Sequence, residues 1–327
     1  MSLLTVRREN WPIRGSFNIA RGSKTAAEVV VAQIEHEGVI GRGECVPYTR
    51  YGETIDSVVD QTESLAQQIA QGLTRIQLQS ALPSGAARNA LDCAMWDLEA
   101  KLTGVPVWRR AGLPPPVSAV TAYTISLSDP EKMAQDAAEA APRHPLLKLK
   151  LGGDRDLDRV EAIRQAAPHV RLIADANEAW SLAHISEFGP AFVELGVELI
   201  EQPLPAGEDR ALASVECPVP LCADESCHDT ASLGSITDKY RFVNVKLDKT
   251  GGLTEALSLI NACQQGNLGI MVGCMVATSL AMAPATLLNP YATYVDLDGP
   301  LLLAEDRKPG LNINNSRVSP PRSELWG

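Results

Sequence analysis

The stretch LLKLK (146–150) ends in Lys150 and is the first of five apolar runs that each end in a charged residue. The others are RLIAD, VELIE, PLCAD and RFVNVK, which end in Asp175, Glu201, Asp224 and Lys246. Successive runs end 22 to 26 positions apart, about the length of one strand, one helix and two loops. We therefore predict that the five charged groups lie at the C-terminal ends of successive parallel strands, where catalysis takes place in a β/α barrel.

The same spacing extends in both directions along the chain, with further apolar runs that end near Thr124, Cys274 and Asp298. Eight runs is the number that closes a β/α barrel, and helical patterns at 154–167 and 252–266 separate some of them. Three prolines at 114–116 and the end of the eighth run set the expected boundaries. These boundaries are an N-terminal domain at 1–115, the barrel at 116–299 and a tail at 300–327 that packs on the first domain.

The N-terminal segment indicates an α+β domain. Residues 27–35 and 39–44 are rich in β-branched side chains and predict two paired strands. Residues 57–72 have helical character, and residues 85–102 carry an apolar stripe at helical spacing. Gly104 follows the second pattern as the expected C-cap of that helix.

Composition excludes several classes of protein. The chain has 327 residues, is 45% hydrophobic and 21% charged, and carries a formal net charge of −11, which argues against nucleic acid as a partner. No apolar run is long enough to cross a bilayer, and the N-terminal residues lack the features of a secretory signal. Seven irregularly spaced cysteines do not form a disulfide framework, so we expect reduced thiols and a cytoplasmic location.

Asp175, Glu201 and Asp224 are the candidate metal ligands. Three carboxylates brought to one rim would repel one another unless a cation neutralised them, and oxygen ligands select Mg²⁺ or a similar ion. Three protein ligands leave coordination positions open for a substrate carboxylate. A single acidic residue at a strand end would more often be a helix cap, but three in succession favour a metal site.

Lys148, Lys150 and Lys246 are the candidate basic groups. Strand alternation puts Lys148 and Lys150 on one face, with Leu149 on the other, and a barrel interior tolerates two lysines only beside anions. Lys246 would then face Lys150 across a bound substrate. The alternative is that these lysines point outward into solvent, which is our interpretation of Lys249.

This set of groups suits proton abstraction next to a carboxylate. Removing that proton creates an enediolate, whose charge a metal ion and an ammonium group stabilise as it develops. A lysine amine acts as the base only if its pKa is lowered towards the working pH, and a crowded cationic site has that effect.

Together these segments resemble the muconate-lactonizing subgroup of the enolase superfamily. The matching segments are KLK (148–150), DANEAW (175–180), EQPLP (201–205), ADES (223–226), VKLDKTGG (245–252) and the helix ARNALDCAMWDLEAKLTG (87–104). The resemblance implies a (β/α)7β barrel of TIM type with an α+β capping domain, built from the N-terminal segment and the C-terminal tail. It implies one Mg²⁺ on the three carboxylates, Lys150 and Lys246 as the acid–base pair, and Lys148 as the group that holds the substrate carboxylate.

Asp296 and Asp298 point to the substrate. They end the eighth run on one strand face, with Leu297 on the other, and two inward carboxylates without a metal role suit an ammonium group. The alternative is a loop cap before Gly299. The pair resembles the Asp-x-Asp motif of dipeptide epimerases, where it binds the N-terminal ammonium.

Further candidates for substrate contact lie at the rim and in the N-terminal domain. Arg21 stands where the family has a flexible capping loop, and the stretch resembles alanyl-glutamate epimerases, which implies that Arg21 binds the glutamate side chain. The alternative is a solvated arginine on a surface loop. Tyr48, Arg50 and Tyr51 resemble a second capping loop. Thr124, Cys274 and Met275 stand at the ends of predicted barrel strands. Thr124 is expected to bind the same carboxylate as Lys148, and the resemblance implies backbone contacts to the peptide at Cys274 and Met275.

The expected reaction is therefore Mg²⁺-dependent epimerisation of L-Ala-D-Glu and L-Ala-L-Glu in murein peptide metabolism. The partner is a small dipeptide, neither nucleic acid nor a membrane is expected, and a homo-oligomer is compatible with the sequence. The alternatives within the fold are o-succinylbenzoate synthase, N-acylamino-acid racemase and cycloisomerase activities. Two further alternatives change the kind of function. One is a Schiff-base lyase that uses Lys150 or Lys246, and the other is a barrel that binds a ligand without catalysis.

Overall fold

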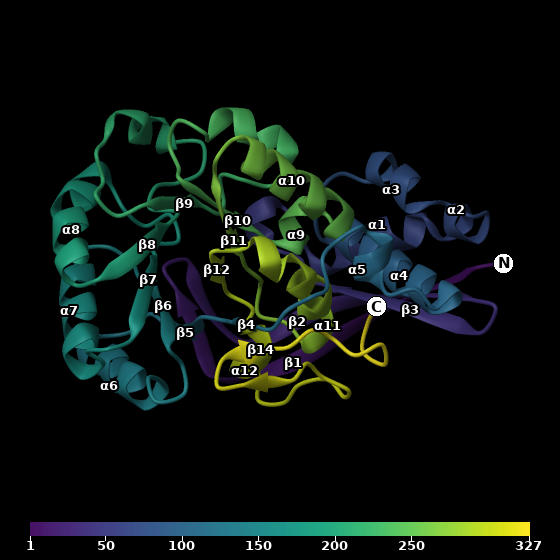
Figure 1. Cartoon of the computed structure of the whole chain (residues 1–327), viewed down its shortest axis with the longest axis horizontal. Coiled ribbons are helices and arrows are strands. Elements are labelled where there is room, and N and C mark those ends of the chain that lie inside the picture. The colour runs from purple at the N-terminus through teal and green to yellow at the C-terminus, as the bar shows by residue number, and fades with distance from the viewer.

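The computed structural model describes all 327 residues, and its largest sheet has eight parallel strands that follow one another in chain order (Figure 1). The strands are β5 (Tyr123–Ile125), β6 (Leu146–Lys150), β7 (Arg171–Asp175), β8 (Val197–Glu201), β9 (Leu221–Ala223), β10 (Phe242–Val245), β11 (Gly269–Val272) and β12 (Tyr294–Val295). A parallel bridge between Thr121 and Val295 joins the two edges, and Ala122 N donates to Val295 O at 2.7 Å. The sheet therefore closes into a barrel, and the predicted TIM-type fold is confirmed.

Seven connections link the eight strands, as in the expected (β/α)7β arrangement. They contain α6 (Pro130–Ala140), α7 (Asp156–Ala166), α8 (Leu182–Glu194), η2 (Asp209–Ser214), η3 (Thr230–Ser235), α9 (Leu247–Thr250), α10 (Leu253–Gln265), α11 (Ser279–Ala285) and η4 (Thr286–Tyr291). The helical patterns predicted at 154–167 and 252–266 correspond to α7 and α10. The connections after β8 and β9 contain only 3₁₀ helices. In the first of these, Pro203, Pro205 and Pro218 lack the N–H groups that an α-helix needs.

Alternation along the strands separates an apolar layer from a charged one inside the barrel. Leu146, Ile173, Leu199 and Cys222 belong to a cluster of seven buried residues at the same level of neighbouring strands. Two positions later, on the same faces, stand Lys148, Asp175, Glu201 and Asp224. The period of two residues therefore fills the base of the barrel with hydrocarbon and directs the charged groups to its C-terminal rim.

The N-terminal domain is a three-stranded antiparallel sheet covered by helices. Its strands are β1 (Leu3–Ile19), β2 (Gly22–His36) and β3 (Val39–Cys45), and its helices are η1 (Thr49–Tyr51), α1 (Ile55–Ser64), α2 (Ala66–Ala70), α3 (Arg75–Ala81), α4 (Ala86–Thr103) and α5 (Val107–Arg110). The helix predicted at 57–72 is interrupted at Leu65, whereas α4 ends at the predicted C-cap, Gly104, in the left-handed region at φ 66°. Strand β1 was not predicted, because its mixed polar sequence lacks a clear alternation of apolar residues.

Two glycines allow α4 to lie directly on β3. A Cβ atom at Gly41 would stand 2.2 Å from Ala94 O, and one at Gly43 would stand 2.1 Å from Ala90 O. Real Cβ atoms do not approach backbone oxygens so closely, so the strand needs glycine at both positions. This close approach fixes α4 between its own sheet and the barrel.

The hairpin of β1 and β2 extends from the small domain to the barrel. Figure 1 shows it in purple, running from the N-terminal side of the molecule to the strands around β5 and β6. Leu127 N, after β5, donates to Asn18 O at 3.0 Å, and Asn18 Nδ2 donates to Leu127 O at 3.4 Å. The tip of the hairpin, around Arg21, is thereby held over the C-terminal rim of the barrel.

The C-terminal tail contacts both parts of the molecule. It contains α12 (Gly299–Leu302), β13 (Ile313–Asn314) and β14 (Arg317–Val318), and β14 pairs with β4 (Ala119–Val120) at the entrance to the barrel. At its end, Trp326 Nε1 donates to Cys93 O of α4 at 3.0 Å, and Gly327 N donates to Asp97 Oδ1 at 2.7 Å. These contacts support the proposal that the tail packs on the capping domain.

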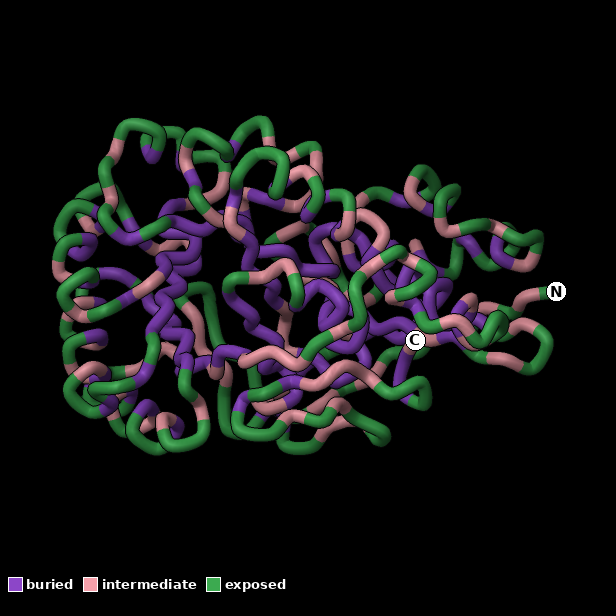
Figure 2. Tube along the Cα trace, viewed as in Figure 1, coloured by how far each residue is buried: buried purple, intermediate pink, exposed green.

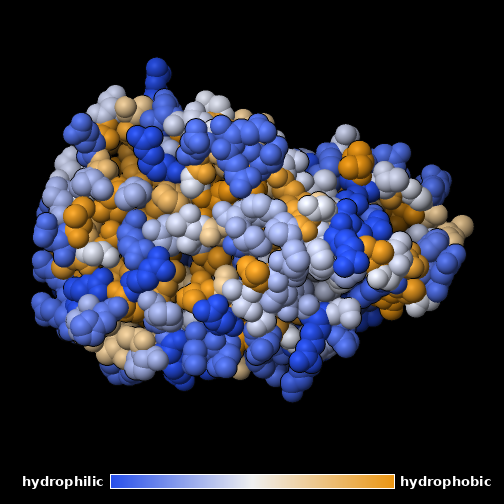
Figure 3. Space-filling view, viewed as in Figure 1, coloured by the Kyte–Doolittle hydropathy of each residue, from blue (hydrophilic) through white to orange (hydrophobic).

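Buried residues are concentrated in the barrel strands and along the junction with the small domain (Figure 2). A second cluster of 17 buried residues fills the space between the three-stranded sheet and its helices. Hydrophilic side chains dominate the face seen in Figure 3, where hydrophobic ones form separate patches. No helix is both long enough and apolar enough to cross a membrane.

Candidate active site

The predicted charged residues meet at the C-terminal rim of the barrel and are nearly inaccessible to solvent. The pairing of β6 with β7 places Lys150 beside Asp175, and the pairing of β7 with β8 places Asp175 beside Glu201. Asp224 and Lys246 directly follow β9 and β10. Each of these five residues is at most 7% exposed.

Lys148 and Lys150 each bind carboxylates of this rim. Lys150 Nζ lies 2.6 Å from Asp175 Oδ2. Lys148 Nζ lies 2.6 Å from Glu201 Oε2, 2.8 Å from Asp296 Oδ2 and 3.2 Å from Asp175 Oδ2. The two lysines therefore point into the barrel, as strand alternation predicts, and Lys148 joins carboxylates from three strands.

Lys246 and Lys249 hold the two oxygens of Asp224. Lys246 Nζ lies 2.6 Å from Oδ2, whereas Lys249 Nζ lies 2.6 Å from Oδ1 and also donates to Asp224 O at 2.5 Å and to Asn244 O at 2.9 Å. The interpretation of Lys249 as a solvated residue is therefore wrong, since it is 1% exposed. The one-turn helix α9 starts directly after β10 and brings Lys249 back to the rim, on the same side as Lys246 three residues earlier.

The electrostatics of the rim depend on burial and on these pairings. Burial alone would raise the pKa of Asp175, but Lys150 and Lys148 hold it well below its usual value. Burial and the neighbouring Asp175 raise the pKa of Glu201 to about 8. For Lys246, burial would lower the pKa, but Asp224 and Glu201 raise it above its usual value. The carboxylates beside Lys246 therefore favour its charged ammonium form.

The donor chemistry of Asp175, Glu201 and Asp224 fits a hard divalent cation, although the three do not converge on one point here. Each carboxylate contacts a lysine instead. Glu201 Oε2 is buried, and the lysine at 2.6 Å does not meet it in hydrogen-bonding geometry, so this oxygen lacks a hydrogen-bond partner. A buried carboxylate oxygen that accepts no hydrogen bond, close to further carboxylates, is a group that a bound cation would satisfy.

A cavity of about 440 Å³ opens above the rim, between the barrel and the hairpin of β1 and β2. Most of the predicted site residues line it, and they come from both domains: Arg21, Thr124, Lys148, Lys150, Asp224, Lys246, Cys274, Met275, Asp296 and Asp298. Asp175 and Glu201 do not line it, because the lysine side chains cover them. The structure thus brings together residues that lie up to 277 positions apart in the sequence (Asp298 minus Arg21).

Asp296 and Asp298 offer carboxylate oxygens to this cavity. Asp296 Oδ2 binds Lys148, whereas Asp296 Oδ1 is buried without a hydrogen-bond partner. Asp298 Oδ2 accepts a hydrogen bond from Thr124 N at 2.7 Å, and burial together with Asp296 raises the pKa of Asp298 to about 7. Thr124 therefore contributes its backbone N–H to this carboxylate.

Arg21 crosses from the hairpin tip to the barrel. Its Nη1 donates to Asn177 O at 2.7 Å and to Glu178 Oε2 at 2.9 Å, and its Nη2 donates to Tyr48 OH at 3.0 Å and to Glu225 Oε1 at 2.5 Å. Sequence reasoning did not single out Glu178 and Glu225, although both stand in the segments DANEAW and ADES. Their partners come from the other domain, so no local pattern identifies them.

Family models match the chain over two ranges. Residues 1–112 match the mandelate racemase / muconate lactonizing enzyme N-terminal domain, and residues 132–324 match the enolase C-terminal domain-like family. The chain belongs to the enolase superfamily. This confirms the predicted family. Its relatives include epimerases and racemases, which confirms the predicted isomerase class.

Two curated relatives share nearly half of their residues with the chain. It is 44% identical to the L-Ala-D/L-Glu epimerase of Escherichia coli (strain K12), over 97% of this chain and 99% of the relative. It is 46% identical to the N-acetyl-D-glutamate racemase of a Pseudoalteromonas species, over 91% of this chain and 95% of the relative. The substrates that these two names give differ in the group on the glutamate nitrogen, which is L-alanyl in one and acetyl in the other. Sequence identity alone therefore does not decide between these two substrates.

Solved structures show the same fold with ligands present. A family member from Agrobacterium tumefaciens, described as homologous to dipeptide epimerases and containing sodium and L-Ala-L-Glu, is 50% identical, with a TM-score of 0.98 and complete coverage of both chains. A dipeptide epimerase from Enterococcus faecalis V583 in complex with Mg and L-Leu-L-Tyr is 27% identical, with a TM-score of 0.89, over 98% of this chain and 97% of that one.

Proposed function

We propose that this protein epimerises L-Ala-D-Glu and L-Ala-L-Glu by moving a proton at the α-carbon of the C-terminal residue. The observation that carries the proposal is the placement of Lys150 and Lys246. Lys150 ends β6 and Lys246 follows β10, and these strands are four apart in a closed barrel of eight, so the two amines stand on opposite sides of the cavity. Two acid–base groups on opposite faces of a carbon are what inversion of its configuration requires.

Each lysine would serve one face of the substrate. One amine removes the α-proton, and the ammonium on the other side returns a proton to the opposite face. Lys148, between Glu201 and Asp296, would hold the substrate carboxylate and offset the charge that develops on it. The assignment of each lysine to one diastereomer follows from variants that lack one of them.

Asp175, Glu201 and Asp224 would hold one Mg²⁺. When bound, the ion would supply the positive charge that stabilises the enediolate oxygens of the substrate. The proposal is supported by the buried oxygen of Glu201 that accepts no hydrogen bond, and by the relative from Enterococcus faecalis, which is described in complex with Mg and a dipeptide.

Asp296 and Asp298 favour a dipeptide over an N-acyl amino acid. The free oxygen of Asp296 and the carboxylate of Asp298 suit an ammonium group, which a dipeptide carries and an N-acetyl amino acid lacks. Racemisation of N-acetylglutamate is the second candidate, because one relative at 46% identity has that activity. Arg21 would complete recognition of the glutamate side chain, with Cys274 and Met275 contacting the peptide.

The biological setting is an extension of the same proposal. L-Ala-D-Glu suggests a role in murein peptide turnover in the cytoplasm. The division into a capping domain at 1–115, a barrel at 116–299 and a tail at 300–327 fits this function, because the cavity lies between the capping hairpin and the barrel.

Proton NMR in D₂O tests the proposal directly. With enzyme, Mg²⁺ and L-Ala-L-Glu, we expect the glutamate α-proton signal to disappear while L-Ala-D-Glu accumulates, and excess chelator should stop both changes. Exchange with N-acetyl-L-glutamate but not with the dipeptide would support the second candidate. Absence of exchange in both substrates, with Mg²⁺ bound, would refute the proposed reaction.

A further inference from the structure

Two separate loops of the capping domain end on the same carboxylate of the barrel. The first is the tip of the β1–β2 hairpin, from which Arg21 Nη1 reaches Glu178 Oε2 at 2.9 Å. The second follows β3, and its Arg50 makes a bidentate pair with Glu178, with Nε to Oε2 and Nη2 to Oε1 both at 2.8 Å. Tyr48 of the second loop also accepts from Arg21 at 3.0 Å, so the two loops are linked to each other.

Glu178 is itself held firmly by the barrel. It lies after β7 and accepts a hydrogen bond from Ala206 N, after β8, at 2.7 Å, while its own N–H donates to Gln202 O at 2.9 Å. Asn177 and Glu178 both adopt left-handed backbone conformations, at φ 44° and 68°, which residues other than glycine rarely do. The strained turn directs the Glu178 side chain outward to the loops, where it is only 7% exposed.

Glu178 does not line the cavity, whereas Arg21, Tyr48 and Arg50 do. Burial would raise the pKa of Glu178, but hydrogen bonds from Arg50 and Ala206 and the charge of Arg21 lower it below its usual value. The carboxylate is therefore ionised at neutral pH and acts on the cavity only through the two arginines.

We propose that Glu178 is the positioning residue that latches both capping loops over the active site. The two loops form part of the wall above the catalytic lysines, so a latched pair keeps water out and keeps a bound dipeptide in. Charge-assisted hydrogen bonds are roughly twice as strong as neutral ones. Glu178 is the one carboxylate that both loops share, whereas Glu225 binds Arg21 of the hairpin loop alone. This inference rests on the proposed function for its kinetic effects, but the loop motion that it describes does not.

The decisive variant is Glu178→Gln, which keeps the shape and the acceptor for Ala206 N but removes the charge. In hydrogen exchange of the full chain, we expect faster exchange in residues 17–27 and 46–53 together. Kinetically, we expect KM for L-Ala-L-Glu to rise about tenfold or more, with kcat changed less than about threefold, because closure is weakened while the lysines stay in place. Arg50→Gln should speed exchange mainly in the second loop.

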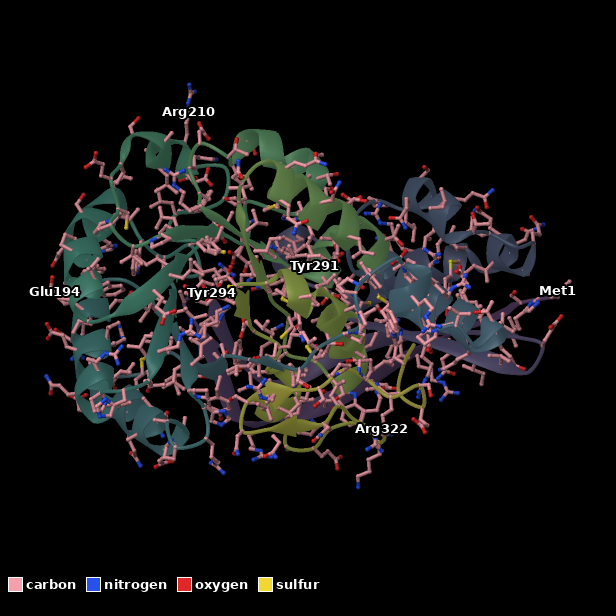
Figure 4. All side chains as sticks on the ribbon, viewed as in Figure 1. Met1, Glu194, Arg210, Tyr291, Tyr294 and Arg322 are labelled. Atoms are coloured by element: carbon pink, nitrogen blue, oxygen red, sulfur yellow. The ribbon has the colours of Figure 1, made fainter.

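A double-mutant cycle separates a latch from a passive salt bridge. If Glu178 acts through Arg50, the Glu178→Gln/Arg50→Gln protein should have a KM close to that of Glu178→Gln alone. Glu194→Gln is the matched control, because Glu194 projects from the outer edge of α8 and makes no salt bridge (Figure 4). Exchange rates of both loops that match wild type in Glu178→Gln would overturn the proposal, as would additive effects on KM.

The same data distinguish this inference from the proposed reaction. If the wild-type protein does not epimerise the dipeptide, the reaction is refuted, but the exchange rates of the two loops still decide the latch. If Glu178→Gln does not fold, Arg50→Gln alone must release the second loop, and unchanged exchange in 46–53 would then overturn the proposal.

Discussion

Lys249 and Lys246 bind different oxygens of the Asp224 carboxylate. Its ammonium contacts both the carboxylate Oδ1, at 2.6 Å, and the backbone oxygen of Asp224, at 2.5 Å. Lys246 contacts the other carboxylate oxygen, Oδ2, at 2.6 Å. Asp224 is therefore fixed between Lys246, which lines the cavity, and Lys249, which does not. The two ion pairs restrict the orientation of the Asp224 carboxylate.

Removing Lys249 should destabilise the protein. Lys249→Met keeps the length of the side chain but removes the only donor to Asp224 Oδ1 and one donor to the backbone oxygens of Asp224 and Asn244. Breaking a buried ion pair by removing one partner typically costs about 3–5 kcal/mol, so we expect a loss of that order in urea unfolding. Lys132→Met, at an exposed pair with Asp136, should change the unfolding midpoint little. Equal midpoints for the two variants would contradict this reading of Lys249.

Variants that lack one of the two cavity lysines should differ in the diastereomer whose α-proton they still exchange. Lys150→Ala and Lys246→Ala each remove one acid–base group, which typically contributes about 100- to 10,000-fold to the rate. We expect epimerisation to fall by that order in both variants, while α-proton exchange persists with only one diastereomer in each. NMR with L-Ala-L-Glu and L-Ala-D-Glu in D₂O measures both quantities. Identical residual exchange patterns in the two variants would show that the lysines do not serve opposite faces.

Asp296 should select for the ammonium group of the substrate. Hydrogen bonds to charged groups contribute about 1.5–3 kcal/mol, so Asp296→Asn should raise KM for L-Ala-L-Glu by roughly tenfold or more. Any exchange with N-acetyl-L-glutamate should be unaffected or improved, because that substrate carries no ammonium. Asp298→Asn provides an independent second variant. A parallel loss with both substrates would point instead to a general role in holding Lys148.

The positions of the charged residues at the barrel rim could be predicted because the sequence signal is local and repeated. A charged residue two positions after a buried apolar one, on strand after strand, needs only the period of a β-strand and the spacing of βα units. Asp175 after Ile173 and Glu201 after Leu199 follow this rule, and both lie where they were predicted.

The features that the sequence did not reveal are the roles of Lys249 and Glu178 and the strand β1. They depend on contacts with other segments of the chain. Lys249 resembled a solvated lysine because only the one-turn helix α9 brings it back to Asp224. Glu178 was overlooked because its partners, Arg21 and Arg50, lie more than 125 positions away in another domain. The long strand β1 was missed because it is stabilised by its pairing with β2 rather than by its own pattern.

Asp248 should make the stability of the protein depend on pH. This carboxylate directly follows Leu247 at the start of α9, is buried, and accepts hydrogen bonds from Val46 N at 3.0 Å and Asn89 Nδ2 at 2.8 Å. Burial raises its pKa from the usual 3.8 to about 7, although both hydrogen bonds act in the opposite direction. No basic side chain pairs with it, and Glu53 and Glu44 nearby raise the pKa further.

Stability decreases as the pH rises from about 4 to about 7, because the folded state retains the proton on Asp248. Between about pH 4 and pH 7 the folded protein keeps Asp248 protonated, whereas the unfolded chain has released that proton. The contribution of this group to stability is therefore complete below pH 4 and is lost as the pH rises to 7, at up to about 1.4 kcal/mol per pH unit. Asp248→Asn cannot titrate and keeps an oxygen for Val46 N and Asn89, so its stability relative to wild type should rise over this range.

Urea unfolding of wild type and Asp248→Asn at several pH values from 4 to 8 measures that difference. Taking the difference removes the contributions of the other buried acids, since they are present in both proteins. Asp238→Asn, at an exposed residue without a salt bridge, should follow wild type at every pH. A difference between wild type and Asp248→Asn that stays constant with pH would show that Asp248 is already ionised in the folded state, and that the junction between α4 and α9 admits water.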